Sequence, residues 1–224
     1  MDLLSTFLLS HFLTITLSSE RGNMRNIRTI ILASASPRRK EILEKTGLKF
    51  RIDESDYEEK INSRLKPHDL ARFLSCEKAG HVARRHRNAL IIAADTIVVL
   101  RGRLFGKPRS TDQAREMLKA LSGKAHSVIT GFTIMDTDSK KEMSCSVESR
   151  VFFKRMTADE IEAYIRSGEP LDKAGAYGIQ GLGAVFIKRI EGDFFNVMGL
   201  PLYALTENLK KFGVNVLRQK NAFV

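Results

Sequence analysis

The stretch from Ala89 to Leu100, which reads ALIIAADTIVVL, decides the fold of this chain, and its single charged side chain is that of Asp95. A continuous apolar run rich in Ile and Val is typical of a strand that is buried on both faces. A bare carboxylate in such a strand costs several kcal/mol, so Asp95 must be neutralised, paired with a cation or bound to a metal. A carboxylate at a strand end with a purely structural role is the alternative.

Strand and helix signals alternate on both sides of this run. The expected strands lie at 27–34, 48–53, 89–100, 127–136 and 146–153, followed by a hairpin of 184–190 with 194–198. The expected helices lie at 38–46, 67–87, 110–123, 157–168 and 201–212. Ser110 with Gln113, and Thr157 with Glu160, have the spacing of capping boxes. Some neighbouring strands have connections too short for parallel crossovers, so we predict an α/β fold with a mixed, twisted sheet flanked by helices.

Length and composition are those of an ordinary globular protein. The 224 residues suffice for one substantial domain, and no linker or repeat is visible. The 37 Lys and Arg against 26 Asp and Glu give a net charge of +11, which favours an anionic partner. These basic residues are spread along the chain, so a nucleotide fits as well as a nucleic acid. The two cysteines lack metal-ligand spacing, and a reducing cytoplasm is the expected location.

The first 23 residues form an extension for which we expect no role in the fold. Residues 3–17 alternate Leu, Phe and Ile with Ser, Thr and His, and the run is too short and too hydroxylated to span a bilayer. No Lys or Arg precedes it, which argues against a secretion signal. Met24 stands shortly before the first convincing strand, so we expect translation to begin there and a single domain to cover 24–224.

Serines and arginines gather where the first expected strand leads into a helix. The segment LASASPRR at 32–39 places Ser34, Ser36, Arg38 and Arg39 at a helix N-terminus, where arginines oppose the macrodipole unless an anion binds. Free backbone N–H groups, hydroxyls and guanidinium groups together suit a phosphate. A simple N-cap at Ser36 with two surface arginines is the alternative. The spacing of a Walker loop is absent.

Other charged side chains are placed to join Asp95. Lys107 follows the Asp95 strand after one reversal of the chain, and Lys78 lies on the preceding helix, although each alone is more often a surface lysine. Glu58 and Glu59 are usually solvent-facing as well. Since Mg²⁺ takes one or two carboxylates plus phosphate oxygens, Asp95 with one of these glutamates would suffice for a metal site.

A glycine-dense loop at 172–183, DKAGAYGIQGLG, surrounds the amide side chain of Gln180. Such a loop lets the backbone approach a flat ligand, and a glutamine can pair with the edge of a base. The loop does not follow the strand-then-helix order of a dinucleotide fingerprint, so a Rossmann site is rejected. A turn that serves only tight packing stays open as the alternative.

Several motifs together resemble those of the Maf family, in the right order over residues 28–213. They are LASASPRR at 32–39, AADT at 93–96, GKP at 106–108, LSGKAHSVITG at 121–131, DKAGAYGIQGLGA at 172–184 and NVMGLP at 196–201. The resemblance implies a fold akin to that of the inosine triphosphate pyrophosphatases. It also implies hydrolysis of nucleoside triphosphates between the α and β phosphates with a divalent metal, Mg²⁺ or Mn²⁺, which would keep non-standard nucleotides from being incorporated.

The resemblance also implies roles for single residues. Asp95 matches the family's proton acceptor. Arg38, Thr96 and Gln180 match positions that tune substrate choice. The positions that line the phosphate and metal site are matched by Ser34, Arg39, Glu59, Lys78 and Lys107, with Glu59 and Asp95 as metal ligands. The GIQG form of the loop resembles the branch that acts on dTTP and UTP, modified pyrimidine nucleotides included, rather than on 7-methyl-GTP.

The function and the oligomeric state stay open in the sequence. A non-catalytic nucleotide- or nucleic-acid-binding regulator of cell division is the rival function, and it predicts salt-sensitive oligonucleotide binding. We expect a nucleoside triphosphate as partner, with no membrane and no stable nucleic acid required, and the oligomeric state is open, a homodimer included.

In a regular strand Asp95 and Thr96 face opposite sides. If both meet the nucleotide, we expect the strand to end or bend there, with Asp95 at the mouth of the sheet.

Overall fold

A mixed seven-stranded sheet forms the centre of the computed structural model, which describes residues 28–57 and 65–218. The strands are β1 (Thr29–Leu32), β2 (Phe50–Ile52), β3 (Ala89–Leu100), β4 (Arg103–Phe105), β5 (Ala125–Asp136), β6 (Glu142–Phe153) and β7 (Ile187–Glu191). Their order is β2-β1-β3-β5-β6-β7, with β4 paired to β3. The pairs of β1 with β2 and β3 are parallel and the others antiparallel. The predicted mixed α/β fold is confirmed, whereas the expected start at Met24 lies outside the described residues.

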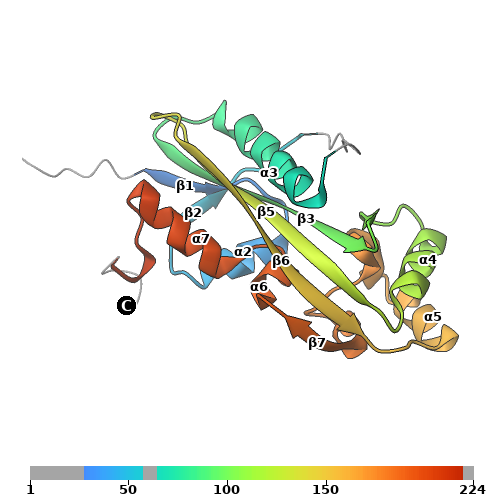
Figure 1. Ribbon diagram of the computed structural model, residues 1–224. Helices are drawn as coiled ribbons and strands as arrows, with labels where there is room; N and C mark the ends of the chain where they lie inside the picture. The colour runs from blue at the N-terminus through green and yellow to red at the C-terminus, as the bar shows by residue number, and fades with distance from the viewer. Residues whose placement is uncertain (1–27, 58–64, 219–224) are drawn as a thin grey trace, which may run out of the picture.

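Helices cover both faces of this sheet (Figure 1). They are α2 (Pro37–Glu44), α3 (Pro67–Ala83), α4 (Thr111–Leu121), α5 (Ala158–Arg166), α6 (Phe194–Met198) and α7 (Leu202–Leu209). Short 3₁₀ turns follow at Glu169–Asp172, Ala174–Ala176, Leu182–Phe186, Lys210–Phe212 and Val216–Arg218. Helix α3 lies on one face, α2 and α7 lie on the other, and α4 with α5 covers one end of the long strands. In the described part of the chain, no helix is both long and apolar enough to cross a membrane.

Strand β3 is buried on both faces, as its composition predicts. Ile91 belongs to the same core cluster as Val82 of α3, and the next residue, Ile92, belongs to the cluster of Leu205 of α7 on the opposite face. Strand alternation therefore divides the apolar run between two cores. Val98 and Leu100 of the same strand join a further cluster under α4 and α5.

The C-terminal third differs from the sequence prediction. The expected hairpin of 184–190 with 194–198 is wrong, because β7 pairs with β6 and Phe194–Met198 forms α6. The side chain of Asp193 caps this helix by accepting from the Phe195 N–H at 2.7 Å. Asn196 is fully buried and donates to Val128 O and Ser149 Oγ, which fastens the short helix to two strands. The run FFNVM is too short for its periodicity to distinguish a strand from a helix.

Of the two expected capping boxes, one is complete. Thr157 and Glu160 bond each other's backbone N–H at the start of α5. At α4, Ser110 accepts from the Gln113 N–H, but the Gln113 side chain accepts from Arg109 instead of from Ser110. The capping spacing thus locates both helix starts and gives the reciprocal bond at only one of them.

The backbone of helix α3 lies very close to the sheet at Gly131 of β5. A Cβ atom on Gly131 would lie 2.1 Å from Ala71 O and 2.6 Å from Arg72 N. Gly131 is also the partner of Asp95 in the β3–β5 ladder. The missing side chain therefore lets α3, which carries Lys78, lie close to the carboxylate.

We expect Gly131→Ala to lower the free energy of unfolding by about 2–3 kcal/mol or more, because the backbone of α3 would have to move away. Gly80→Ala is the matched control within α3, since a Cβ there meets nothing within 4 Å. That variant should gain about 0.5–1 kcal/mol from the better helix propensity of alanine. Urea unfolding measures both changes, and a Gly131→Ala variant as stable as the wild type would contradict the close approach.

His126 of β5 is a buried imidazole beside aromatic rings. Its Nε2 lies 2.8 Å from the Tyr177 hydroxyl, its Nδ1 is buried with no partner among the described residues, and Phe153 and Tyr177 contact its ring edge-on. Burial lowers the pKa of His126 from 6.5 to about 4. The neutral ring is therefore the form that the fold accommodates.

This histidine should make stability depend on pH. The unfolded chain protonates it near pH 6.5 and the folded chain only near pH 4, so its contribution is complete above pH 6.5 and is lost as the pH falls towards 4. We expect a loss of about 2–3 kcal/mol over that range. Urea unfolding at several pH values should show a shallower loss for His126→Gln. Identical pH profiles for the variant and the wild type would refute the assignment.

Candidate active site

A cavity opens where, within residues 28–57 and 65–218, no strand pairs with one edge of β3. Strand β1 pairs with β3 only as far as Ile92, and β4 pairs with it only from Val98 onward. On the other edge, the ladder to β5 is continuous from Leu90 to Val99. The cavity at the gap has a volume of about 440 Å³, which suits a small organic ligand.

Asp95 and Thr96 both line this cavity although they belong to opposite faces of the sheet. The strand does not end at this point, because β3 continues to Leu100 and its ladder to β5 has no register shift. A cavity at the edge of a strand can be reached from both faces. The open edge of β3 therefore lets both side chains line the cavity without a break in the strand.

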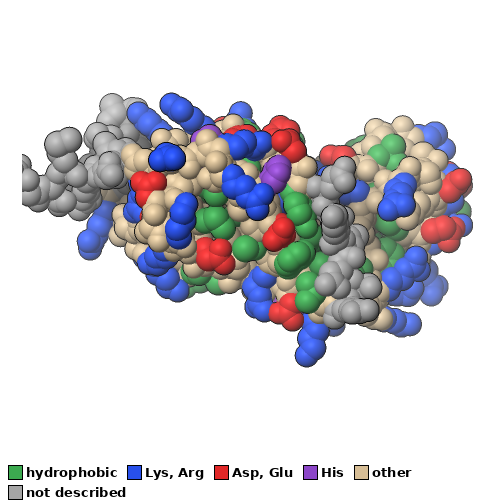
Figure 2. Space-filling model, turned by 90° about the horizontal axis from the view of Figure 1, so that it is seen from above, with side chains coloured by type: hydrophobic (Ala, Val, Ile, Leu, Met, Phe, Trp, Pro, Cys, Tyr) green, Lys and Arg blue, Asp and Glu red, His purple; other side chains and the backbone are tan. Residues whose placement is uncertain are grey.

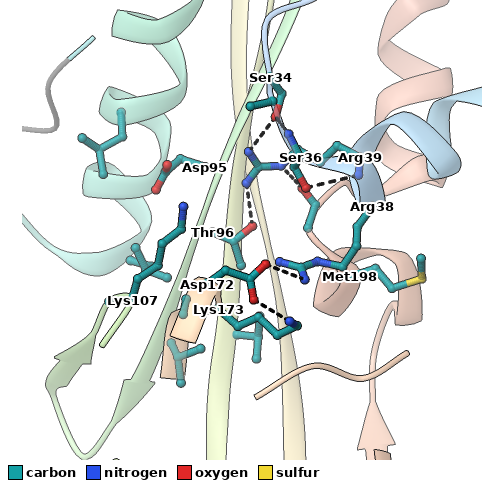
Figure 3. Close-up of a pocket in the computed structure, with 18 of the residues that line it drawn as sticks. Ser34, Ser36, Arg38, Arg39, Asp95, Thr96, Lys107, Asp172, Lys173 and Met198 are labelled. Carbon is teal, nitrogen blue, oxygen red and sulfur yellow. Dashed lines mark hydrogen bonds and ion pairs between the residues drawn. The ribbon is translucent and has the colours of Figure 1, made fainter. Parts of the chain in front are cut away.

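The Asp95 carboxylate is buried and paired. The residue is 6% exposed, and Lys78 of α3 donates to its Oδ1. The Lys78 side chain is itself only 14% exposed and lines the cavity. Lys107 lines the same cavity from the segment after β4, and its side chain points towards Asp95 (Figure 3). Lys78 thus supplies the cation that a buried carboxylate needs, and a second ammonium lies nearby.

The start of α2 forms the opposite wall. Ser36 is the N-cap and accepts from the Arg39 N–H at 3.5 Å, while its own N–H donates to Ser34 Oγ at 3.2 Å. The Arg39 guanidinium donates to Ser34 Oγ at 3.3 Å, to Thr96 Oγ1 at 3.2 Å and to Gly199 O at 2.8 Å. Three of its bonds therefore go to protein oxygens, so Arg39 ties α2, β3 and the end of α6 together.

A chain of polar groups continues from Thr96 into the sheet. Thr96 Oγ1 lies 2.9 Å from Thr130 Oγ1, which is 2.9 Å from the backbone oxygen of Asn196. The Asn196 side chain accepts from the Thr130 N–H at 3.2 Å. Thr130 and Asn196 are fully buried with their polar groups satisfied. Sequence reasoning missed both, although each stands inside a quoted motif, LSGKAHSVITG and NVMGLP.

Arg38, next to Arg39, faces a different partner. Its Nη1 lies 3.9 Å from Asp172 Oδ2. Lys173 donates to Asp172 Oδ1 at 2.5 Å and to Glu169 O at 2.8 Å. Arg38, Asp172 and Lys173 all line the cavity, and we call these three residues the Arg38 trio (Figure 3). Asp172 and Lys173 were not singled out from the sequence, because a charged pair before a glycine-rich turn carries no distinctive spacing.

Two predicted site residues are not placed at the cavity. Gln180 is exposed, does not line the cavity, and donates to Glu41 Oε2 at 3.1 Å. Glu59, like Glu58, lies outside the described residues, so its predicted metal role stays a prediction. Within 28–57 and 65–218, no group of three or more His, Cys, Asp or Glu side chains could hold a metal ion.

The basic charge is dispersed on the face of the molecule seen in Figure 2. Lys and Arg side chains occur along its whole length, with acidic side chains between them. A nucleic-acid-binding surface usually gathers its basic residues in one patch or stripe. This face therefore gives no support to the rival function of a nucleic-acid binder.

Comparison with known proteins agrees with the predicted family and fold class. A family model described as Maf-like protein matches residues 29–212. A dTTP/UTP pyrophosphatase of Methanosarcina barkeri is 48% identical over 194 residues, which is 86% of this chain and 98% of the relative. Proteins of the same name from Methanococcoides burtonii and Bacillus cereus are 49% and 46% identical, over 85% and 88% of this chain and 98% and 96% of their own. The chain belongs to the Maf-like protein family.

Proposed function

We propose that this Maf-like protein is a nucleoside triphosphate pyrophosphatase that hydrolyses dTTP and UTP to the nucleoside monophosphate and pyrophosphate. Relatives of that name share 46% to 49% identity with it over most of its length. The observation that carries the proposal is the buried Asp95–Lys78 pair in a cavity that further cationic side chains line. We place the activity in the cytoplasm, where it would remove non-standard pyrimidine nucleotides from the triphosphate pool.

Asp95 acts as the general base in this proposal. Its carboxylate orients a water molecule at the open edge of β3 and takes its proton. The water oxygen bonds to phosphorus, the anhydride link between the α and β phosphates breaks, and pyrophosphate leaves with the electron pair of that bond. The continuous ladder to β5 holds the base in place, because the backbone of Asp95 is fixed on that edge.

Cationic side chains stabilise the charge that develops on the phosphates. Lys78 and Lys107 stand beside Asp95, so they are placed for the triphosphate end of the substrate. Chemistry of this kind depends mainly on positioning and electrostatics, which suits a site rich in cations. Arg39 contributes by holding Ser34 and Thr96 in the cavity wall.

A divalent cation, Mg²⁺ or Mn²⁺, fits the donor chemistry of this cavity. Asp95 offers a hard oxygen donor at the cavity wall, and Mg²⁺ is commonly bound by one or two carboxylates together with substrate phosphate oxygens. Asp95, together with Glu59, would hold the ion. When bound, the ion supplies charge neutralisation at the phosphates.

We expect Asp95→Asn to lower kcat for pyrophosphate release from UTP by about 10²–10⁴-fold, because the amide cannot take the proton from water. The fold should survive, since the cavity lets water reach the ammonium of Lys78. Pyrophosphate release and thermal unfolding check the two statements. Asp159→Asn, an exposed position on α5, is the matched control. Near-wild-type turnover by Asp95→Asn would show that another group is the base.

A panel of nucleoside triphosphates, assayed with Mg²⁺ and with EDTA, tests the reaction class. We expect pyrophosphate release from dTTP and UTP that EDTA abolishes, because EDTA would remove the divalent cation that is proposed to neutralise the phosphates. Oligonucleotide binding at several salt concentrations runs in parallel. Salt-sensitive binding without any phosphate chemistry would favour the rival regulator, which the comparisons do not support.

A further inference from the structure

We infer that the Arg38 trio reads the edge of the uracil or thymine base, an inference that rests on the proposed function. Both bases present an acceptor, a donor and an acceptor in a row, namely O2, N3–H and O4. Arg38, Asp172 and Lys173 present the complementary row of a guanidinium donor, a carboxylate acceptor and an ammonium donor. Each donor of one row therefore faces an acceptor of the other, and no group has to gain or lose a proton for the base to bind.

The geometry keeps the carboxylate between the two cations. Lys173 Nζ donates to Asp172 Oδ1 at 2.5 Å, and Arg38 Nη1 lies 3.9 Å from Asp172 Oδ2. The second contact is longer than a hydrogen bond, so the guanidinium can bond a base while it stays beside Asp172. The Asp172 side chain is 67% exposed, whereas those of Arg38 and Lys173 are 29% and 14% exposed. The acceptor is thus open to a ligand, and the cations that flank it are partly fixed.

The loop that carries Asp172 fixes the ammonium of Lys173. This ammonium also donates to Glu169 O, and the Lys173 chain passes where a side chain on residue 178 would stand, because a Cβ on Gly178 would lie 2.8 Å from Lys173 Cε. The Glu169 carboxylate accepts from the N–H groups of Leu182 and Gly183, at 2.8 and 3.1 Å. One acidic residue therefore links both ends of the glycine-dense loop.

The charge state of Asp172 gives this row of groups its selectivity. Desolvation opposes the charge, but Lys173 and Arg38 outweigh it and hold the pKa of the Asp172 carboxyl below its usual range. At neutral pH the group is therefore an acceptor only. Cytosine would turn the lone pair of its N3 towards this carboxylate and an amino group towards a cation. Both contacts are repulsive, so the site should reject CTP.

The position of the trio leaves room for the phosphates elsewhere. Figure 3 shows Asp95 and the Arg38 trio on either side of Thr96, so the base and the triphosphate would occupy separate ends of the cavity. Ile179 and Met198 also line the cavity and offer apolar surface to the base. Gln180, the residue that the sequence placed at the base edge, bonds Glu41 instead.

Removal of the N3–H from the substrate tests the pairing directly. We expect the wild-type protein to lose roughly 10- to 100-fold in kcat/KM with 3-methyluridine triphosphate relative to UTP, because a hydrogen bond to a charged group is lost. In Asp172→Ala this ratio should shrink to within about threefold, since the partner of the N3–H is gone. Asp159→Ala, an exposed carboxylate on α5, should keep the wild-type ratio.

Asp172→Asn adds a gain of function. Its amide can accept from the N3–H of uracil or donate to the N3 of cytosine, so the kcat/KM of CTP relative to UTP should rise by about tenfold or more. Asp159→Asn should leave this ratio unchanged. Because Asp172 is largely exposed, thermal unfolding should find both Asp172 variants folded.

The outcomes separate this inference from the function on which it rests. If the wild-type protein releases no pyrophosphate from UTP, the proposed function fails. If UTP is hydrolysed but Asp172→Ala keeps the full penalty for the methylated base, the Arg38 trio does not read the base. Loss of that penalty in Gln180→Ala alone would assign the base edge to Gln180 and overturn the inference.

Discussion

The site depends on the stretch of β3 between Ile92 and Val98, where one edge of the strand pairs with no other strand in the described part of the chain. Strand β1 ends early because the chain turns into α2, and β4 takes up the edge only after the reversal beyond Leu100. On the other edge, β5 holds the same residues in an unbroken ladder. A carboxylate can occupy the middle of an apolar strand here because its backbone is rigid and its side chain has a cavity beside it.

The packing of α3 and the pairing of Asp95 with Lys78 both depend on the absence of a side chain at Gly131. The lack of a side chain at Gly131 lets the helix backbone approach β5, directly across the ladder from Asp95. Lys78 on that helix then reaches the carboxylate. A buried carboxylate without its cation costs several kcal/mol, so a change that moves α3 away would also disturb the pairing of Asp95 with Lys78.

Local features of this protein, and Lys78 as a candidate partner of Asp95, were readable from the sequence, whereas most other tertiary partners were not. The bounds of β3, the need of Asp95 for a cation and the capping box at Thr157 follow from composition and spacing within a dozen residues. The bond from Arg39 to Thr96 joins residues 57 positions apart, and that from Gln180 to Glu41 joins residues 139 apart. The periodicity of a sequence predicts on which face of a helix or strand a side chain lies. The partner of that side chain, however, depends on which other elements pack against the face.

The two arginines at the start of α2 show why the tertiary partners of a residue matter for its chemical role. In the sequence, Arg38 and Arg39 resemble a clamp for phosphate, yet successive residues on a helix point in directions about 100° apart. Arg39 accordingly bonds Ser34, Thr96 and Gly199, while Arg38 faces Asp172. Lys78 and Lys173 likewise carry carboxylate partners. The acceptor groups of a nucleotide that enters this cavity therefore compete with these protein oxygens for the cations. The selectivity of the site then depends on which protein acceptor each cation releases.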